Sequence, residues 1–143
     1  MIAELTQDLL NKLSTVTELQ GRVGTQLGGT DTDAALIETP IPFSWILFNG
    51  STPLETNGGN GRKYAVNRVE FVVLLAIEYG LELEQDFITY QLSLIDKAVG
   101  AVHASEEVNY SGLWEFTGCN LHSVYPNRLV YQLGFSANGH YTF

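Results

Sequence analysis

Cysteine is nearly missing from this 143-residue sequence, and Cys119 is the single exception. One thiol cannot close an internal disulfide, so the composition does not indicate an oxidising compartment. The first residues, Met1–Asp8, contain neither a basic stretch nor an unbroken apolar run, so we expect no signal peptide. No apolar run approaches the ~20 residues that span a bilayer. The chain is therefore predicted to be soluble and intracellular, with no membrane partner.

Basic residues are scarce, since seven Lys and Arg stand against sixteen Asp and Glu and give a net charge of −9. Surfaces that bind nucleic acids are built from clustered Lys and Arg, so this balance argues against a phosphate-binding surface. It is compatible with an acidic channel through which DNA slides without binding. Apolar residues make up 45% of the chain, well above the range of disordered proteins. At this length we expect one domain, residues 1–143, with a core of its own.

Motifs for catalysis and for ligand binding are also missing. The Gly-rich stretch 57–63 lacks Gly-Lys-Ser/Thr and precedes a predicted strand, so it offers a phosphate no helix N-terminus. Cys119 and His122 are three residues apart on a predicted strand, and this odd separation directs side chains to opposite faces. The acidic residues between 31 and 38 lack the glycine and the third acid of a calcium loop. We predict no catalytic residue, no metal site and no cofactor.

Two segments have the apolar spacing of amphipathic helices. The first covers about residues 2–20 and ends before Gly21, which suits a helix C-cap. The second covers Asp86–His103, and its apolar residues span roughly 200° of the helical wheel, whereas a helix on one sheet needs about 100°. The surplus predicts a second neighbour, either the first helix or another subunit. A single helical turn is also predicted at Asp33–Ile37.

Strand patterns fill most of the remaining chain. Odd positions from Val69 to Tyr79 are all apolar, which marks the strongest strand. The order helix, strands, helix, strands predicts an α+β fold, a small, mostly antiparallel sheet with two main helices packed on one face. The predicted strands are Arg22–Leu27, Phe43–Asn49, Tyr64–Tyr79, Leu113–Cys119, Leu121–Tyr125 and Arg128–Ser136.

The stretch Ser51–Gly61 separates two predicted strands and is rich in Gly, Ser, Thr and Asn. A hairpin needs only about 2–5 connecting residues, so we interpret this stretch as a long flexible loop. Two interpretations of its role stay open, namely a tolerated surface insertion and an arm that orders against an acidic partner or DNA. The candidate partner-binding residues are Ser51, Asn57, Gly59, Asn60, Arg62 and Lys63, and the candidate subunit-interface residues are Phe87, Tyr90 and Leu94.

The closing part of the sequence has a characteristic pattern of residue types, with Gly112–Gly118 (GLWEFTG), Tyr125 and then Arg128–Phe135 (RLVYQLGF). Together with the opening residues, the paired strands and the second helix, this order resembles the tail-terminator (tail-completion) proteins of tailed bacteriophages. The resemblance covers nearly the whole chain. It lies in the order of the elements, the length of the chain and the pattern of residue types, without a short diagnostic motif. The other segments that carry it are Met1–Leu5, Phe43–Asn49, Tyr64–Tyr79 and Asp86–Val102.

The resemblance implies a structural virion protein and no enzyme. Such a protein forms a hexameric ring that caps the finished tail tube, ends its polymerisation and joins it to the head-side neck. The implied partners are further copies of the chain, the tail tube, the sheath protein if the tail is contractile, and the neck or connector protein. DNA passes through the ring without specific binding, and the protein resides at the head-proximal end of the virion tail after assembly in the host cytoplasm. Two alternatives stay open: a neck, sheath-joining or baseplate adaptor protein, and a small α+β enzyme with an unrecognised site.

Overall fold

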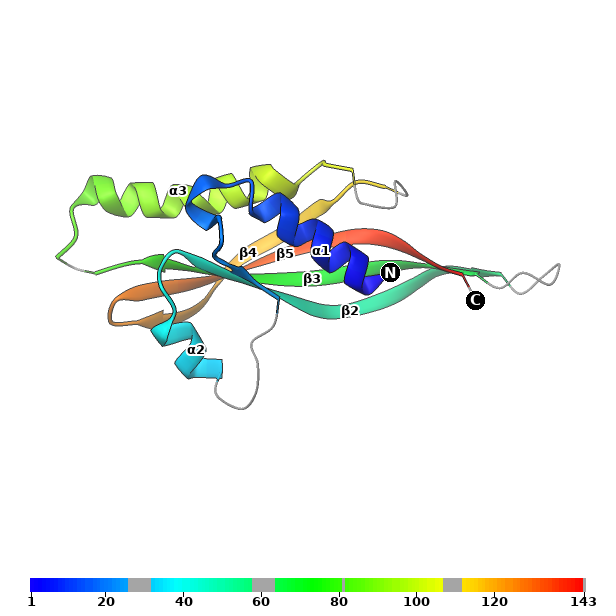
Figure 1. Cartoon of the computed structure of the whole chain (residues 1–143), viewed down its shortest axis with the longest axis horizontal. Helices are drawn as coiled ribbons and strands as arrows, with labels where there is room; N and C mark the ends of the chain where they lie inside the picture. The colour runs from blue at the N-terminus through cyan, green and yellow to red at the C-terminus, as the bar shows by residue number, and fades with distance from the viewer. Residues whose placement is uncertain (26–31, 58–63, 81, 107–111, 143) are drawn as a thin grey trace.

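A computed structural model describes residues 1–25, 32–57, 64–80, 82–106 and 112–142 of the chain (Figure 1). Of the helices in these residues, none has the length and apolar character needed to cross a membrane. The elements, in chain order, are α1 (Ile2–Leu13), the 3₁₀ helix η1 (Thr17–Leu19), β1 (Val23–Gly24), α2 (Thr32–Glu38), β2 (Phe43–Asn57), β3 (Tyr64–Glu78), α3 (Gln85–Val102), β4 (Glu115–Tyr125) and β5 (Arg128–Thr142).

The strands form one five-stranded sheet in the order β1-β2-β3-β5-β4. The short β1 is parallel to β2, and every other neighbouring pair is antiparallel. β3 lies in the centre and pairs with β2 from Tyr64 to Ala76 and with β5 along its whole length. The ends of β2, β3 and β5 extend the sheet beyond the helices as a long arm (Figure 1). The mostly antiparallel sheet is therefore as predicted.

The main core lies between the sheet and the two long helices, which share one face (Figure 1). Because side chains alternate along a strand, the odd positions of β3 point to this face and the even positions to the other. This confirms the prediction of two main helices on one face. The fully or almost fully buried residues of this core include Leu5, Leu9 and Leu13 of α1, Leu94, Ala98 and Val102 of α3, Val69, Phe71, Val73, Leu75 and Ile77 of β3, and Leu133 and Phe135 of β5.

A smaller cluster covers part of the opposite face. Leu36 of α2 packs there with Trp45 and with even-numbered residues of β3. The single helical turn predicted at Asp33–Ile37 is thus α2, which lies on the side away from α1 and α3 (Figure 1). The buried side chain of Arg128 holds α2 in place, since its Nη1 donates hydrogen bonds to the carbonyl oxygens of Leu36 (2.9 Å) and Thr39 (2.7 Å).

The first helix is shorter than predicted, because α1 ends at Leu13 and not near residue 20. The segment from Ser14 to Thr17 contains hydroxyl and β-branched residues, whose side chains compete for backbone groups or lose rotamers in a helix. Thr15 shows this competition, since its Oγ1 donates to the carbonyl oxygen of Lys12 at 2.6 Å. The apolar spacing continues only because η1 buries Leu19 in the same core.

Several strand boundaries also differ from the predictions. The two strands expected before Tyr125 are one strand, β4, with register shifts between Phe116 and Gly118 and between Leu121 and Ser123. β5 continues past Ser136 to Thr142, and β1 covers only Val23–Gly24. In β4 the bulges interrupt the alternation of side chains, which makes one strand resemble two in the sequence.

The predicted loop Ser51–Gly61 is wrong over Ser51–Asn57, because these residues belong to β2 and pair with β3 from Val69 to Tyr64. Residues 58–61 lie outside the described part of the chain. The error has a physical origin in Pro53, which lacks a backbone N–H and is tolerated in an edge strand, and in two register shifts that hide the period of two.

Candidate functional site

The predicted partner-binding residues lie on both sides of the connection between β2 and β3. Ser51 is exposed on β2, and its Oγ accepts a hydrogen bond from Asn67 Nδ2 at 3.4 Å. Asn57 is the last residue of β2 and pairs with Tyr64. Gly59, Asn60, Arg62 and Lys63 lie outside the described residues. A paired strand, and not a free loop, therefore leads to this segment, and its role in partner binding stays a prediction.

The predicted subunit-interface residues fall into two groups. Leu94 is 0% exposed and lies in the main core, so its side chain is not at the surface of the chain. Phe87 and Tyr90 are exposed, and the interface prediction stays open for them. The neighbouring helix α1 and the sheet account for much of the wide apolar arc of α3. Leu92 is an exposed apolar residue of this helix that the sequence prediction did not single out.

Tyr90 lies on the flank of α3 that faces η1. The ammonium of Lys97 lies 5.0 Å from the centroid of the Tyr90 ring and 3.2 Å from Glu18 Oε1. These contacts connect α3 to η1 at the surface, where ion pairs contribute only about 0–1 kcal/mol. This flank of α3 is therefore held only weakly to η1, and Tyr90 stays exposed.

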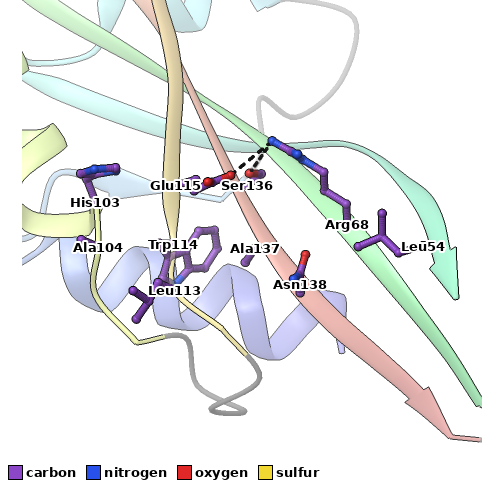
Figure 2. Close-up of a pocket in the computed structure, with 10 residues that line it drawn as sticks. All are labelled: Leu54, Arg68, His103, Ala104, Leu113, Trp114, Glu115, Ser136, Ala137 and Asn138. Carbon is purple, nitrogen blue, oxygen red and sulfur yellow. Dashed lines mark hydrogen bonds and ion pairs between the residues drawn. The ribbon is translucent and has the colours of Figure 1, made fainter.

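A pocket of ≈ 490 Å³ lies where β4 begins beside β5 (Figure 2). Arg68 on β3 is its central polar residue, since its Nη2 donates to Ser136 Oγ at 3.2 Å and lies 3.4 Å from Glu115 Oε2. Figure 2 shows these three side chains together, with His103 away from them on the other side of Trp114. The three residues come from three strands, so the sequence alone did not bring them together.

The geometry of this pocket does not activate its serine. Ser136 is buried, and its hydroxyl accepts a hydrogen bond from the guanidinium of Arg68, a group without a lone pair to take a proton. His103 Nδ1 accepts the backbone N–H of Phe116 at 3.1 Å, which leaves the ring proton on Nε2. A nucleophilic hydroxyl needs an acceptor base within about 2.6–3.2 Å. Arg68, Glu115 and Ser136 therefore link β3, β4 and β5 through polar contacts.

Cys119 and His122 lie on β4, at one edge of the sheet. Cys119 is exposed and pairs with Leu133, while His122 lies at a register shift with its Nδ1 3.1 Å from Ser123 Oγ. In the part of the chain that the structure describes, no three His, Cys, Asp or Glu residues gather in a way that could hold a metal ion. The absence of a required metal stays a prediction.

The reactivity of Cys119 is predictable from its surroundings. Desolvation raises the pKa of the Cys119 thiol above its ordinary value, so less thiolate is present at a given pH. Because only the thiolate is nucleophilic, we expect the alkylation of Cys119 by iodoacetamide to be slow near neutral pH and to keep accelerating above about pH 9. The same chain unfolded in urea provides the control, with an ordinary thiol. If the rate in the folded protein levels off at a lower pH than the rate in the unfolded chain, this expectation is contradicted.

Neither a protein-family model nor a curated protein matches the sequence. Solved structures do match the fold. One is a chain of the "Virion of native gene transfer agent (GTA) particle", with a TM-score of 0.53 and 11% sequence identity. The match covers 96% of this chain and 95% of that chain. At this identity the likeness concerns the fold alone, and it extends over nearly the full length of both chains.

Proposed function

We propose that this chain is a structural virion protein that forms a ring, caps the phage tail tube, ends its polymerisation and joins it to the head-side neck. The observation that carries the proposal is the fold likeness to a chain of a gene transfer agent virion over 96% of this chain and 95% of that one. The tail-terminator role within the virion rests on the sequence resemblance.

The charge of the chain supports the same role. A ring of subunits that each carry a net charge of −9 repels the phosphates of DNA, because like charges in a narrow channel reinforce one another. DNA therefore crosses such a ring without binding to it. The partners in this proposal are further copies of the chain, the tube, the sheath protein in a contractile tail, and the connector at the neck. Its location is the head-proximal end of the tail.

Assembly of the purified protein tests the proposal. Light scattering after size exclusion, at several concentrations and with preformed tail tubes, is expected to show a closed ring of about six copies, because cyclic closure is common among homo-oligomers. Negative-stain images are expected to place the ring at one end of each tube and to show that capped tubes stop growing. A chain that stays monomeric with its tubes present contradicts the proposal. Rings that bind the connector or baseplate but never the tube end identify an adaptor protein.

A further inference from the structure

The two outer strands of the sheet have open backbone edges in the described part of the chain. β4 is the last strand on one side, and no described strand pairs with its outer edge. On the other side, β1 pairs with β2 only at Ser44 and Trp45, and no described residue pairs with the outer edge of β2 from Ile46 onward. Open edges invite pairing with other chains, and soluble proteins usually protect them with charged side chains, Lys above all.

Most of each edge strand lacks that protection. No Asp, Glu, Lys or Arg occurs between Phe43 and Leu54 or between Phe116 and Tyr125, although the chain contains 23 such residues in total (16 acidic and 7 basic). The central strand β3, which needs no protection, carries Arg68, Glu70 and Glu78. The charges of the edge strands are thus confined to Glu55 near the end of β2 and Glu115 at the start of β4, and the uncharged stretches are open to contact with another chain.

The β4 side carries an apolar ridge, formed by Leu92, Leu121 and Val124. Leu121 pairs with Tyr131 and Val124 with Leu129, so both point to the helix face of the sheet, where Val124 is 60% exposed. The ring of His103 accepts the N–H of Phe116 on β4. Leu92 is eleven residues, about three helical turns, before His103 and therefore lies on the same flank of α3, which faces β4. Cys119 lies on the same face, opposite Leu133.

The β2 side carries a groove of ≈ 810 Å³ between α1 and the edge strand. Its most exposed large apolar residue is Phe48, which is 47% exposed and points to the same face as the ridge, since it pairs with Phe71. None of the residues that line the groove is charged. These residues are Ile2, Ala3, Thr6 and Gln7 of α1, Thr25, and Ile46, Leu47 and Phe48 of β2.

We propose that the ridge of one copy packs into the groove of the next, so that copies associate head to tail. The occupant is a second copy because a chain of net charge −9 repels itself except where acidic residues are missing, and the groove and the ridge both lack them. The two surfaces differ, as a heterologous interface requires, and they lie at opposite edges of the sheet. Register shifts in both edge strands and Pro53 in β2 interrupt the ladder, so apolar side chains, and not a continuous backbone ladder, make the contact. This inference gives the ring of the proposed function its interface and depends on that function.

The native Cys119 beside the ridge allows a direct test. A Gln7→Cys variant places a second thiol in the groove, and a flexible bismaleimide is then expected to link Cys119 of one copy to residue 7 of the next. Because each copy carries both thiols, the linked products form a ladder that ends at the size of the ring. Two controls carry one thiol each, the wild-type chain and the Gln7→Cys/Cys119→Ser variant, and neither can be linked beyond a dimer. Dimers alone from the two-thiol variant, under conditions where light scattering shows rings, overturn the head-to-tail contact.

Two blocking variants distinguish the interface from the function. Phe48→Lys places a charge in the groove and Val124→Lys places one on the ridge, and each is expected to weaken self-association at least about tenfold, because a buried unpaired charge is costly. Each variant keeps one intact surface, so mixing them is expected to give a 1:1 dimer that neither forms alone. If wild-type rings form and both variants still form them, the surfaces are wrong while the proposed function stands. If the wild-type chain never associates with itself or with tubes, both proposals fall.

Discussion

Replacement of Trp114 by alanine is expected to lower the free energy of unfolding by about 3–5 kcal/mol, the usual cost of removing a buried tryptophan. Trp114 is 0% exposed, and its ring centroid lies 5.7 Å from that of Phe71 on the central strand. Its Nε1 donates to Asp8 Oδ2 of α1 at 2.8 Å. The side chain therefore joins α1, β3 and the start of β4, and its loss leaves a cavity that three separate elements cannot fill together.

The backbone of Trp114 adds a second connection. Its carbonyl oxygen accepts the N–H of Ala104, and its own N–H donates to the carbonyl oxygen of Ser105, so the turn after α3 is fixed to the start of β4. Both bonds involve backbone atoms, which Trp114→Ala retains. The loss in Trp114→Ala is accordingly confined to the side chain, and urea unfolding followed by circular dichroism measures it.

Trp114→Phe is the matched control. It keeps an aromatic ring against Phe71 but removes the indole N–H, and Asp8 keeps its ion pair with Lys12 at 2.8 Å. Because the carboxylate is not left without a partner, we expect this variant to lose only about 1–2 kcal/mol. Equal losses in the phenylalanine and alanine variants contradict the assignment of most of the energy to packing.

The elements with a regular apolar period were predictable from the sequence. β3 shows the period of two because it is central and straight, and its odd positions form the main core. α3 shows the helical period and ends within one residue of its prediction. Where a helix or strand contacts one neighbour on each side, the spacing of its apolar residues is enough to predict it. The α+β architecture then follows from the order of the elements.

The edge strands were less predictable, for reasons that the structure makes clear. Ser51–Asn57 has no apolar alternation, Ser51–Leu54 are exposed, and Pro53 is tolerated in an edge strand. The bulges in β4 divided one strand into two in the prediction. The polar cluster of Arg68, Glu115 and Ser136 depends on a register between three strands, which residue types alone do not determine.

The candidate interface was partly present in the sequence. The excess apolar arc of the second helix pointed to a further neighbour, but it included Leu94, which the subunit buries itself. The stronger signal is the lack of charge in two segments, and it acquires meaning only when those segments are known to be the edges of a sheet. An uncharged strand in the middle of a sheet is ordinary, whereas an uncharged stretch at an edge is open to contact with another chain.

Arg128→Met is expected to lower the free energy of unfolding by about 2–4 kcal/mol, because it leaves the buried carbonyl group of Leu36 and the partly buried one of Thr39 without their donor. Burial lowers the pKa of the Arg128 guanidinium, which reflects the cost of desolvating the cation. The hydrogen bonds to the carbonyl oxygens of Leu36 and Thr39 offset this cost at the end of α2, where helix carbonyls lack partners within the helix. Methionine retains the apolar stem of the side chain but supplies no donor.

The loss is expected to be local. α2 is held to the sheet by Leu36 and Arg128, so hydrogen exchange in Arg128→Met is expected to become fast in α2 while α1 and α3 stay protected. Trp45, which is buried beside Leu36, is expected to become accessible to acrylamide quenching. Arg128→Lys keeps the charge without the planar fork, and we expect it to lose about half as much. Equal exchange rates in α2 of the wild-type and methionine variants contradict this assignment.

The same variant also separates stability from assembly. α2 lies on the face of the sheet opposite α1 and α3 (Figure 1), whereas Phe48 of the groove and Leu121 and Val124 of the ridge pair with residues of the helix face. Arg128→Met should therefore associate as the wild-type chain does at temperatures where it stays folded, although it is the less stable protein. Phe48→Lys and Val124→Lys replace exposed side chains and should show the reverse, with near-normal stability and lost association. If Arg128→Met loses self-association in proportion to its stability, the contact between copies includes the α2 face, and the ridge and groove are not sufficient to form it.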